Sequence, residues 1–218
     1  MNRNTFLKVV CSIALAVVIA APAMPGAPGG KEVSIGDLTA NKSMGSRQAP
    51  ITVEVFADFQ CPQCRNFYLT TTRQLIDNYV ATGKVFLVHH DFPLSMHTYS
   101  HQAARWASAA ATLGPGVFET VEQALYSHQD EWGATGNIQP ILAAVVSPAD
   151  MKRIQFVETT QAAELDAAVA RDMALGNSRH VDATPSIFVT HNGQTTALPP
   201  GGVDYKLLKQ YLDYLLQH

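Results

Sequence analysis

A run of β-branched and aromatic residues leads directly into a pair of cysteines, and this junction constrains the fold more than any other feature of the chain. Residues 51–59 read ITVEVFADF, which is typical of a buried strand. They are followed by Cys61-Pro62-Gln63-Cys64, after which apolar residues recur at helical spacing to about Ala81. Gly83 ends this helix, and residues 84–90, KVFLVHH, predict a second strand. A strand, a helix and a strand in this order predict a βαβ unit whose two strands run parallel.

The middle of the chain, residues 99–177, is predicted to be helical. An alanine-rich helix stops near Gly114-Pro115-Gly116, and another is expected over residues 118–128. Ser147-Pro148-Ala149-Asp150 supplies an N-cap, a first-turn proline and an early carboxylate, which together indicate a helix start. A further helix is expected over residues 161–175, closed by Gly176-Asn177.

The last part of the chain returns to β-structure. Two short strands, over residues 186–190 and 194–198, flank Asn192-Gly193, and Asn-Gly is the strongest short signal for a hairpin. Asp204 is expected to cap a final amphipathic helix. The apolar face of that helix is predicted to hold Leu207, Leu208, Tyr211, Leu212, Leu215 and Leu216. The whole order predicts an α/β fold in which a helical insertion, at about residues 98–180, separates a βαβ half from a ββα half.

The N-terminal residues have the pattern of an export signal. Arg3 and Lys8 precede an apolar run over residues 9–21. Ala21-Pro22-Ala23 then provides the small residues that a signal peptidase recognises. The run is shorter than the ~20 residues that a membrane-spanning helix needs. We therefore expect a signal peptide over residues 1–23, with an uncleaved anchor as the alternative. A linker rich in Gly, Pro, Lys and Ser is expected over residues 24–46, and a domain over residues 47–218.

Cleavage of this signal would leave Cys61 and Cys64 as the cysteines of the mature chain, in a compartment where disulfides persist. Cys61 is expected at a helix N-terminus, where free backbone N–H groups and the helix dipole favour a thiolate. The thiolate attacks disulfides, and Cys64, one turn later, is placed to resolve a mixed disulfide. Three other interpretations are a structural disulfide, a zinc site and chance. A four-residue loop stabilises by only about 2 kcal/mol, and a zinc site would need ligands other than a second cysteine pair.

The remaining composition narrows the function classes. A formal net charge of −3 gives no electrostatic reason to expect binding to nucleic acid or to an anionic membrane surface. Four histidines, His89, His90, His97 and His101, allow a metal site as an alternative interpretation. Positions at strand ends and in loops favour a structural role for them instead, so we predict no metal site.

The segment over residues 53–64, VEVFADFQCPQC, resembles the active-site segment of the DsbA-like branch of the thioredoxin superfamily. The resemblance continues through Asp91-Phe92-Pro93-Leu94 with His97, through residues 116–132, and through Ala183-Thr184-Pro185-Ser186, and it covers about residues 49–218. It implies a thioredoxin fold carrying the helical insertion.

The resemblance also implies roles for the matching residues. Cys61 would be the nucleophile and Cys64 the resolving thiol, with Pro62 and Gln63 between them. Pro185 would be a cis-proline that faces the two sulfurs, with Thr184 before it in the same active-site loop. An ordinary loop proline ahead of a strand is the alternative interpretation of Thr184-Pro185.

Two positions depart from the family's pattern. Many relatives carry a buried glutamate six residues before the nucleophile, where this chain has Val55; Glu54 is adjacent but is expected to face the other side of the strand. The strongest oxidants of the family have histidine beside the proline, where this chain has the uncharged Gln63. We therefore expect a less oxidising disulfide than that of a protein with a Cys-Pro-His-Cys motif.

These features predict an exported, periplasmic or extracytoplasmic thiol–disulfide oxidoreductase, first of all an oxidase that introduces disulfides into secreted or periplasmic proteins. The alternatives are a reductase or isomerase, and a non-enzymatic module that binds a metal or a partner. Dithiol–disulfide exchange needs no cofactor. The expected partners are folding exported proteins with thiols and a membrane redox protein that recycles the pair. The linker is too short for a dimerisation domain, so a monomer is expected.

Overall fold

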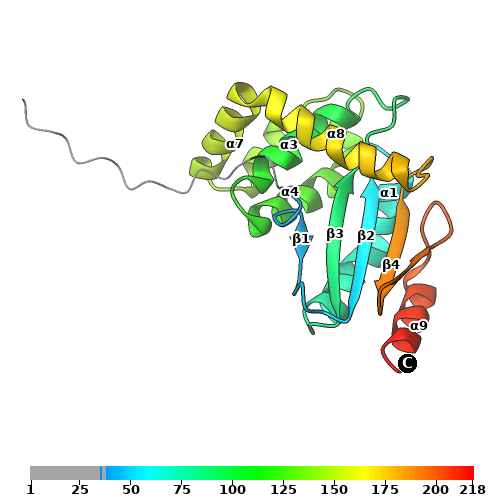
Figure 1. The fold of residues 1–218 in the computed structure, drawn as a ribbon. Coiled ribbons are helices and arrows are strands. Elements are labelled where there is room, and N and C mark those ends of the chain that lie inside the picture. Colours follow the sequence, from blue (N-terminus) through cyan, green and yellow to red (C-terminus); the bar gives the residue numbers. More distant parts are fainter. Residues whose placement is uncertain (1–34, 36–37) are drawn as a thin grey trace, which may run out of the picture. The chain divides into compact units, whose positions relative to one another are not determined.

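A five-stranded mixed sheet forms the centre of the part of the chain that the computed structural model describes, which is residue 35 and residues 38–218. The predicted signal peptide lies outside the described residues. The strand order is β1-β3-β2-β4-β5, and Figure 1 shows β3, β2 and β4 side by side. β2 and β3 are parallel, as the βαβ pattern predicted, and the other neighbours are antiparallel. The strands are β1 (Ser43–Met44), β2 (Ile51–Ala57), β3 (Val85–Asp91), β4 (Ser186–His191) and β5 (Gln194–Ala197).

Helices surround this sheet, and most of them lie between β3 and β4 in the sequence. The helix that follows β2 is a continuous run of α1 (Pro62–Phe67), η2 (Tyr68–Thr72), α2 (Arg73–Leu75) and η3 (Ile76–Val80), in which the two η segments are π-helical. The insertion contains α3 (Ser100–Ala111), α4 (Pro115–Ser127), α5 (Gln129–Trp132), α6 (Gln139–Val145), α7 (Pro148–Thr160) and α8 (Ala162–Ser178). The chain closes with α9 (Tyr205–Leu215). Among the described residues, no helix is both long and apolar enough to cross a membrane.

The helical insertion is built on small and aromatic residues. On α3, Ala103, Ala107 and Ala110 are fully buried, and small side chains of this kind let neighbouring helices approach closely. Phe118 and Trp132 of the insertion have no exposed surface, and the Phe118 ring lies 5.4 Å from the ring of His89 on β3. Figure 1 shows α8 crossing the carboxyl ends of β2 and β3, so the insertion covers the end of the sheet at which the cysteine motif begins.

The helix predicted to stop at Gly176-Asn177 in fact continues to Ser178, and this expectation was wrong. Gly176 is inside α8 because the helix passes close to the sheet there: a Cβ atom would lie 2.6 Å from Cε2 of Phe92 and 3.1 Å from Cδ1 of Phe56. The glycine therefore serves close packing rather than helix termination. The positive φ that ends a helix is found instead at His180, at 60°.

Two other local signals were confirmed. Asn192 and Gly193 have φ values of 49° and 76°, as a tight hairpin between β4 and β5 requires. The side chain of Ser147 accepts a hydrogen bond from the backbone N–H of Asp150 at 3.0 Å, which caps α7.

The last helix, α9, is capped as predicted, because the Asp204 carboxylate accepts from the backbone N–H of Leu207 at 2.8 Å. Leu208 and Leu212 are buried, and each such side chain contributes about 1.5–3 kcal/mol. Leu207, which the pattern placed on the same face, is 55% exposed. Its assignment was wrong because a residue next to Leu208 points about 100° away around the helix, and the contact of α9 with the domain is narrow.

The first strand, β1, lies in the segment that the sequence pattern assigned to a linker. It pairs antiparallel with β3, with Ser43 opposite Val88 and Met44 opposite Leu87. Lys42, directly before it, is only 2% exposed. This short segment therefore brings a buried positive charge to the carboxyl half of β3.

Candidate active site

Cys61 lies at the junction between β2 and α1, where local structure exposes the first N–H groups of a helix. Its backbone is extended, with φ −73° and ψ 123°, so it is the N-cap residue, and Pro62 takes the first helical position. The Cys61 carbonyl accepts from Arg65 N at 3.1 Å, which closes the first turn. Gln129 of α5 fixes the same segment by donating to the carbonyl oxygens of Phe59 and Cys61 at 2.7 and 3.0 Å.

The surroundings of the Cys61 sulfur favour the thiolate. The pKa of Cys61 is lowered to about 5, and the largest cause is a hydrogen bond from the Cys64 side chain. Burial opposes this effect. Smaller contributions that lower the pKa come from the backbone N–H of Cys64, the Thr184 side chain and the backbone N–H of Gln63. The side chain of Gln63 itself is exposed. The contribution of Gln63 is therefore made by its backbone, a group that any residue at this position except proline would supply.

Cys64 is the more protected of the two cysteines, at 2% exposed. Its Sγ accepts a hydrogen bond from the backbone N–H of Asp58 at 3.4 Å. Burial, followed by the neighbouring Cys61, raises the pKa of Cys64 well above its usual value. Both cysteines are free thiols in this structure. The pair therefore consists of one acidic sulfur and one sulfur that holds its proton.

The Thr184-Pro185 loop faces this pair from the other half of the fold. The peptide bond between these two residues is cis, as the resemblance implied. Cys61 Sγ donates to the carbonyl oxygen of Thr184 at 3.5 Å, although the two residues are 123 positions apart. The buried hydroxyl of Thr184 makes no other hydrogen bond among the described residues, so it is free to turn toward the two sulfurs. The four predicted loop residues thus divide into Pro62 and Gln63 at the helix start and Thr184 and Pro185 on the facing loop.

Asp58, which the sequence pattern did not single out as functional, holds the loop before the cysteines. Its side chain is fully buried. Its Oδ2 accepts from Leu94 N at 2.9 Å and contacts His97 Nδ1 at 2.6 Å, while its Oδ1 accepts from Gln60 N at 2.8 Å. These bonds fix the backbone whose N–H reaches the Cys64 sulfur. The signal for this role was an aspartate near the end of the strand-forming run of residues 51–59, just before the cysteines.

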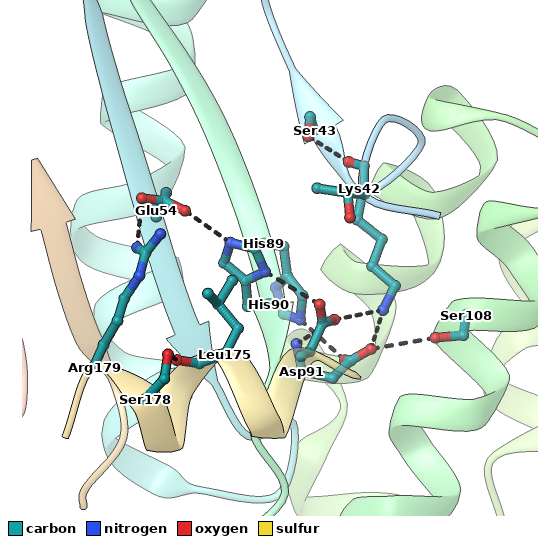
Figure 2. Close-up of polar contacts among 12 residues, drawn as sticks. Lys42, Ser43, Glu54, His89, His90, Asp91, Ser108, Leu175, Ser178 and Arg179 are labelled. Atoms are coloured by element: carbon teal, nitrogen blue, oxygen red, sulfur yellow. Dashed lines mark hydrogen bonds and ion pairs between the residues drawn. The ribbon is translucent and has the colours of Figure 1, made fainter. Parts of the chain in front are cut away.

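A buried network of charged side chains lies beside the site, and the sequence pattern did not predict it. Figure 2 shows Lys42 directed at Asp91, with Ser108 also donating to that carboxylate, at 3.2 Å. Lys42 reaches Asp172 as well, at 3.0 Å. The network contains the acids Glu54, Asp91, Glu122 and Asp172 and the bases Lys42, His89, His90 and Arg179. With both histidines protonated, these four negative and four positive charges cancel, which reduces the cost of burying them.

The four histidines considered as metal ligands contact different carboxylates instead. His89 pairs with Asp91 and Glu122, and His90 pairs with Glu54 and Asp172. His97 contacts Asp58, and His101 lies 3.8 Å from Asp166. In the described part of the chain, no group of three or more potential ligands is placed to hold a metal ion.

The departure at Val55 has a clear structural counterpart. Val55 faces the side of the sheet that carries Cys64, whereas Glu54 points to the opposite side, as expected. There Glu54 contacts His90 at 3.1 Å and Arg179 at 2.6 Å. Burial would raise the pKa of Glu54, but these two partners lower it below its usual value. Glu54 therefore stabilises the far side of the sheet and does not replace the missing carboxylate.

A dithiol with one acidic cysteine at a helix N-cap, facing a cis-proline loop on a sheet of this topology, defines a thiol–disulfide oxidoreductase with a thioredoxin fold. The thioredoxin family model matches residues 38–205, which is more than half of the chain. The chain therefore belongs to the thioredoxin family, and it resembles the DsbA-like branch.

Individual relatives agree with this placement. The chain is 25% identical over 197 residues to a Bacillus cereus protein described as "Probable disulfide bond formation protein D", covering 88% of this chain and 90% of that protein. It matches the oxidised BdbD of Bacillus subtilis with a TM-score of 0.65 at 19% identity, covering 82% of this chain and 94% of the other. It matches alpha-DsbA1 of Wolbachia pipientis with a TM-score of 0.64 at 20% identity, covering 81% and 90% of the two chains.

Proposed function

We propose that the chain is an exported oxidase that introduces disulfides into secreted or periplasmic proteins through Cys61 and Cys64. The observation that carries the proposal is the unequal acidity of the two thiols. A sulfur with a pKa of about 5 is a good leaving group and a stable thiolate at neutral pH, which favours the reduced form of the pair. A pair whose reduced form is stabilised gives its disulfide to other proteins.

The reaction proceeds through a mixed disulfide. A thiolate of a folding substrate attacks Cys61 Sγ in the oxidised pair, the Cys61–Cys64 bond breaks, and Cys64 leaves with the electron pair and takes up a proton. A second substrate thiolate then attacks the substrate sulfur of the mixed disulfide, and Cys61 leaves as a thiolate. Two electrons pass to the enzyme, and a membrane redox partner removes them in the next cycle.

The Thr184-Pro185 loop binds the substrate during this exchange. Its backbone lies against Cys61, within 3.5 Å of the sulfur at the Thr184 carbonyl oxygen. An extended substrate segment that adds to this loop as a strand would place its cysteine next to Cys61, and backbone pairing of this kind tolerates many sequences. The export proposed here rests on the N-terminal pattern of the sequence and on the relatives' link to disulfide formation.

A redox titration against glutathione tests the direction of electron flow. We expect a potential between about −120 mV, typical of the strong oxidant DsbA, and about −180 mV, typical of protein disulfide isomerase. The expected pair is weaker than DsbA because the pKa of Cys61, about 5, lies above the ~3.5 of that protein. A potential near −270 mV, which is typical of thioredoxin, would instead identify a reductase.

Oxidative refolding of a reduced, disulfide-containing substrate tests the activity itself. Oxidised protein in stoichiometric amount should restore native disulfides, and the Cys61→Ser variant should not. A protein that neither oxidises nor reduces such a substrate, and that binds a metal stoichiometrically until its thiols are alkylated, would favour the non-enzymatic module over the enzyme.

A further inference from the structure

A small cavity borders Cys64, whose side chain is one of those that line it. Its volume is about 20 Å³, which is enough for one water molecule. Apolar walls are provided by residues such as Val55 and Pro185. The ionisable side chains that line the cavity, besides Cys64, are Lys42, Tyr68, His89, Glu122 and Tyr126. The cavity thus connects the buried thiol to the charged network of Figure 2.

Cys64 needs a proton partner at this position. When it leaves the enzyme disulfide it gains a proton, and when it attacks a mixed disulfide it loses one. Asp58 can only donate its backbone N–H to the sulfur, and the Thr184 hydroxyl faces it from the opposite loop. With 2% of its surface exposed, Cys64 has little access to bulk water. The proton must therefore be exchanged with a group that the cavity reaches.

Four of the five candidates are unsuited to accept it at neutral pH. Burial and nearby acidic groups raise the pKa values of Tyr68 and Tyr126, so both remain neutral phenols. Burial lowers the pKa of Lys42, but Asp91 and Asp172 outweigh it, so the ammonium stays charged. 

His89 is also protonated. Burial alone would lower its pKa, but hydrogen bonds with Asp91 and Glu122 raise it to about 9. The remaining group is the Glu122 carboxylate on α4, which is 5% exposed and whose Oε1 lies 2.8 Å from His89 Nδ1. Glu122 and Cys64 both line the cavity, so the carboxylate and the thiol border the same small space.

We propose that Glu122 is the proton acceptor and donor for Cys64, acting through one water in the cavity, with His89 as its positioning partner. In the resolving direction, Cys64 gives its proton to Glu122, the Cys64 thiolate attacks Cys61 Sγ, and the substrate leaves as a thiolate. In the oxidising direction, protonated Glu122 gives the proton back as Cys64 leaves. Oxidation states change only at sulfur, and the proton stays within the protein.

The arrangement explains how the site works with Val55 on the strand. The carboxylate comes from the helical insertion instead of β2, and β3 orients it: His89 Nε2 contacts Asp91 Oδ1 at 3.2 Å, and Asp91 pairs with Lys42. Lys42 comes from the segment before β1. The proton path is therefore assembled from three parts of the chain, and it rests on the thiol–disulfide exchange proposed above.

The test is the Glu122→Gln variant, with Glu119→Gln as its matched control. Glu119 lies one turn earlier on the same helix and lines a different surface depression, so its substitution removes the same charge away from Cys64. The reaction of each oxidised protein with a dithiol peptide is followed in single turnovers from pH 5 to pH 9 by acid quenching and thiol counting. In parallel, the absorbance of the thiolate near 240 nm gives the pKa of Cys61 in each reduced protein.

We expect Glu122→Gln to slow the release of Cys64 at neutral pH by on the order of 10²-fold, the usual size of a general acid–base contribution, and to change the shape of the pH profile. The pKa of Cys61 should stay within a few tenths of a unit of the wild-type value. Glu119→Gln should leave both the rate and the profile unchanged, and Glu122→Asp should recover part of the rate. A Glu122→Gln profile that superimposes on that of the wild type overturns the proposal, whereas an inactive wild type would overturn the proposed function instead.

A measurement on the wild-type protein covers the case in which Glu122→Gln does not fold. With glutamate labelled by ¹³C at the carboxyl group, infrared difference spectra follow carboxylate protonation in the oxidised and the reduced protein. We expect the protonation of one buried glutamate to differ between the two redox states, because the Cys61 thiolate and the Cys64 proton are present only in the reduced protein. Identical glutamate titrations in the two redox states would overturn the proposal without any variant.

Discussion

The acidity of Cys61 should make the reduced protein more stable at neutral pH than at acid pH, by an amount that the structure predicts. The pKa of this thiol is about 5 in the folded state, against about 8.5 in an unfolded chain. A group whose pKa is lowered by folding contributes stability in full above its unfolded pKa and loses it as the pH falls through the folded value. At pH 7 the thiol is two units above the folded pKa, which corresponds to about 2.7 kcal/mol. Because solvent that reaches the sulfur screens these interactions, we expect the thiolate to contribute about 2 kcal/mol to the free energy of unfolding.

Urea unfolding of the reduced wild type and of Cys61→Ser, each at pH 4 and pH 7, measures this contribution. Serine keeps a hydroxyl of similar size but does not ionise in this range, so every other titrating group cancels in the comparison. The unfolding free energy of the wild type should rise between pH 4 and pH 7 by about 2 kcal/mol more than that of the variant. The same stabilisation raises the redox potential of the pair, at about 30 mV for each 1.4 kcal/mol. If the two proteins show the same pH dependence, the thiolate is not stabilised and the argument for an oxidase loses its support.

Three further predictions follow from single contacts. Thr184→Val should raise the pKa of Cys61, measured by thiolate absorbance, because the hydroxyl that helps lower it is removed; an unchanged pKa would contradict this. Gly176→Ala should destabilise the protein by about 1–3 kcal/mol through overpacking, because the new Cβ would lie 2.6 Å from a phenyl carbon of Phe92. The control, Gly116→Ala, has open space around it and should not destabilise the protein in this way. Equal effects of the two variants in thermal unfolding would refute the close approach. Because folding raises the pKa of His89 to about 9, the contribution of His89 to stability is full below pH 6.5, and the stability of Cys61→Ser should fall by on the order of 2 kcal/mol between pH 6.5 and pH 9; a flat urea-unfolding curve over this range would exclude a buried, protonated imidazole.

The parts of the fold that the sequence predicted are those whose signals are local. The strand before Cys61 and the helix after it both follow from hydrophobic periodicity within about twenty residues, and the parallel pairing of β2 with β3 follows from the handedness of a βαβ connection. The caps at Ser147 and Asp204 were likewise local. A side chain three residues from its backbone partner leaves a pattern that can be recognised in one sequence.

The charged network left no such pattern, because its members are far apart in the chain. Lys42 is 49 residues from Asp91 and 130 from Asp172, yet it contacts both. Each residue alone has the composition of an ordinary exposed charge, and Lys42 stood in a segment rich in the residues of a linker. Gly176 shows that tertiary packing also limits the prediction of helix ends. In the sequence, a glycine that ends a helix cannot be told from a glycine that a neighbouring aromatic ring requires.

The unequal chemistry of the two thiols arises from their spacing rather than from any charged neighbour. Cys61 is the N-cap of α1, so the backbone N–H groups of Gln63 and Cys64 remain free to stabilise its sulfur. Cys64, three residues later, lies in the first turn of the helix and turns inward, where burial keeps it protonated. An uncharged residue at Gln63 leaves this difference intact, because the stabilising groups are backbone atoms and the partner thiol. What the local motif cannot provide is an exit for the Cys64 proton, and in this chain that exit depends on Glu122, a residue of the helical insertion. The insertion therefore does more than enclose the site: on this reasoning it completes the chemistry that the cysteine motif begins.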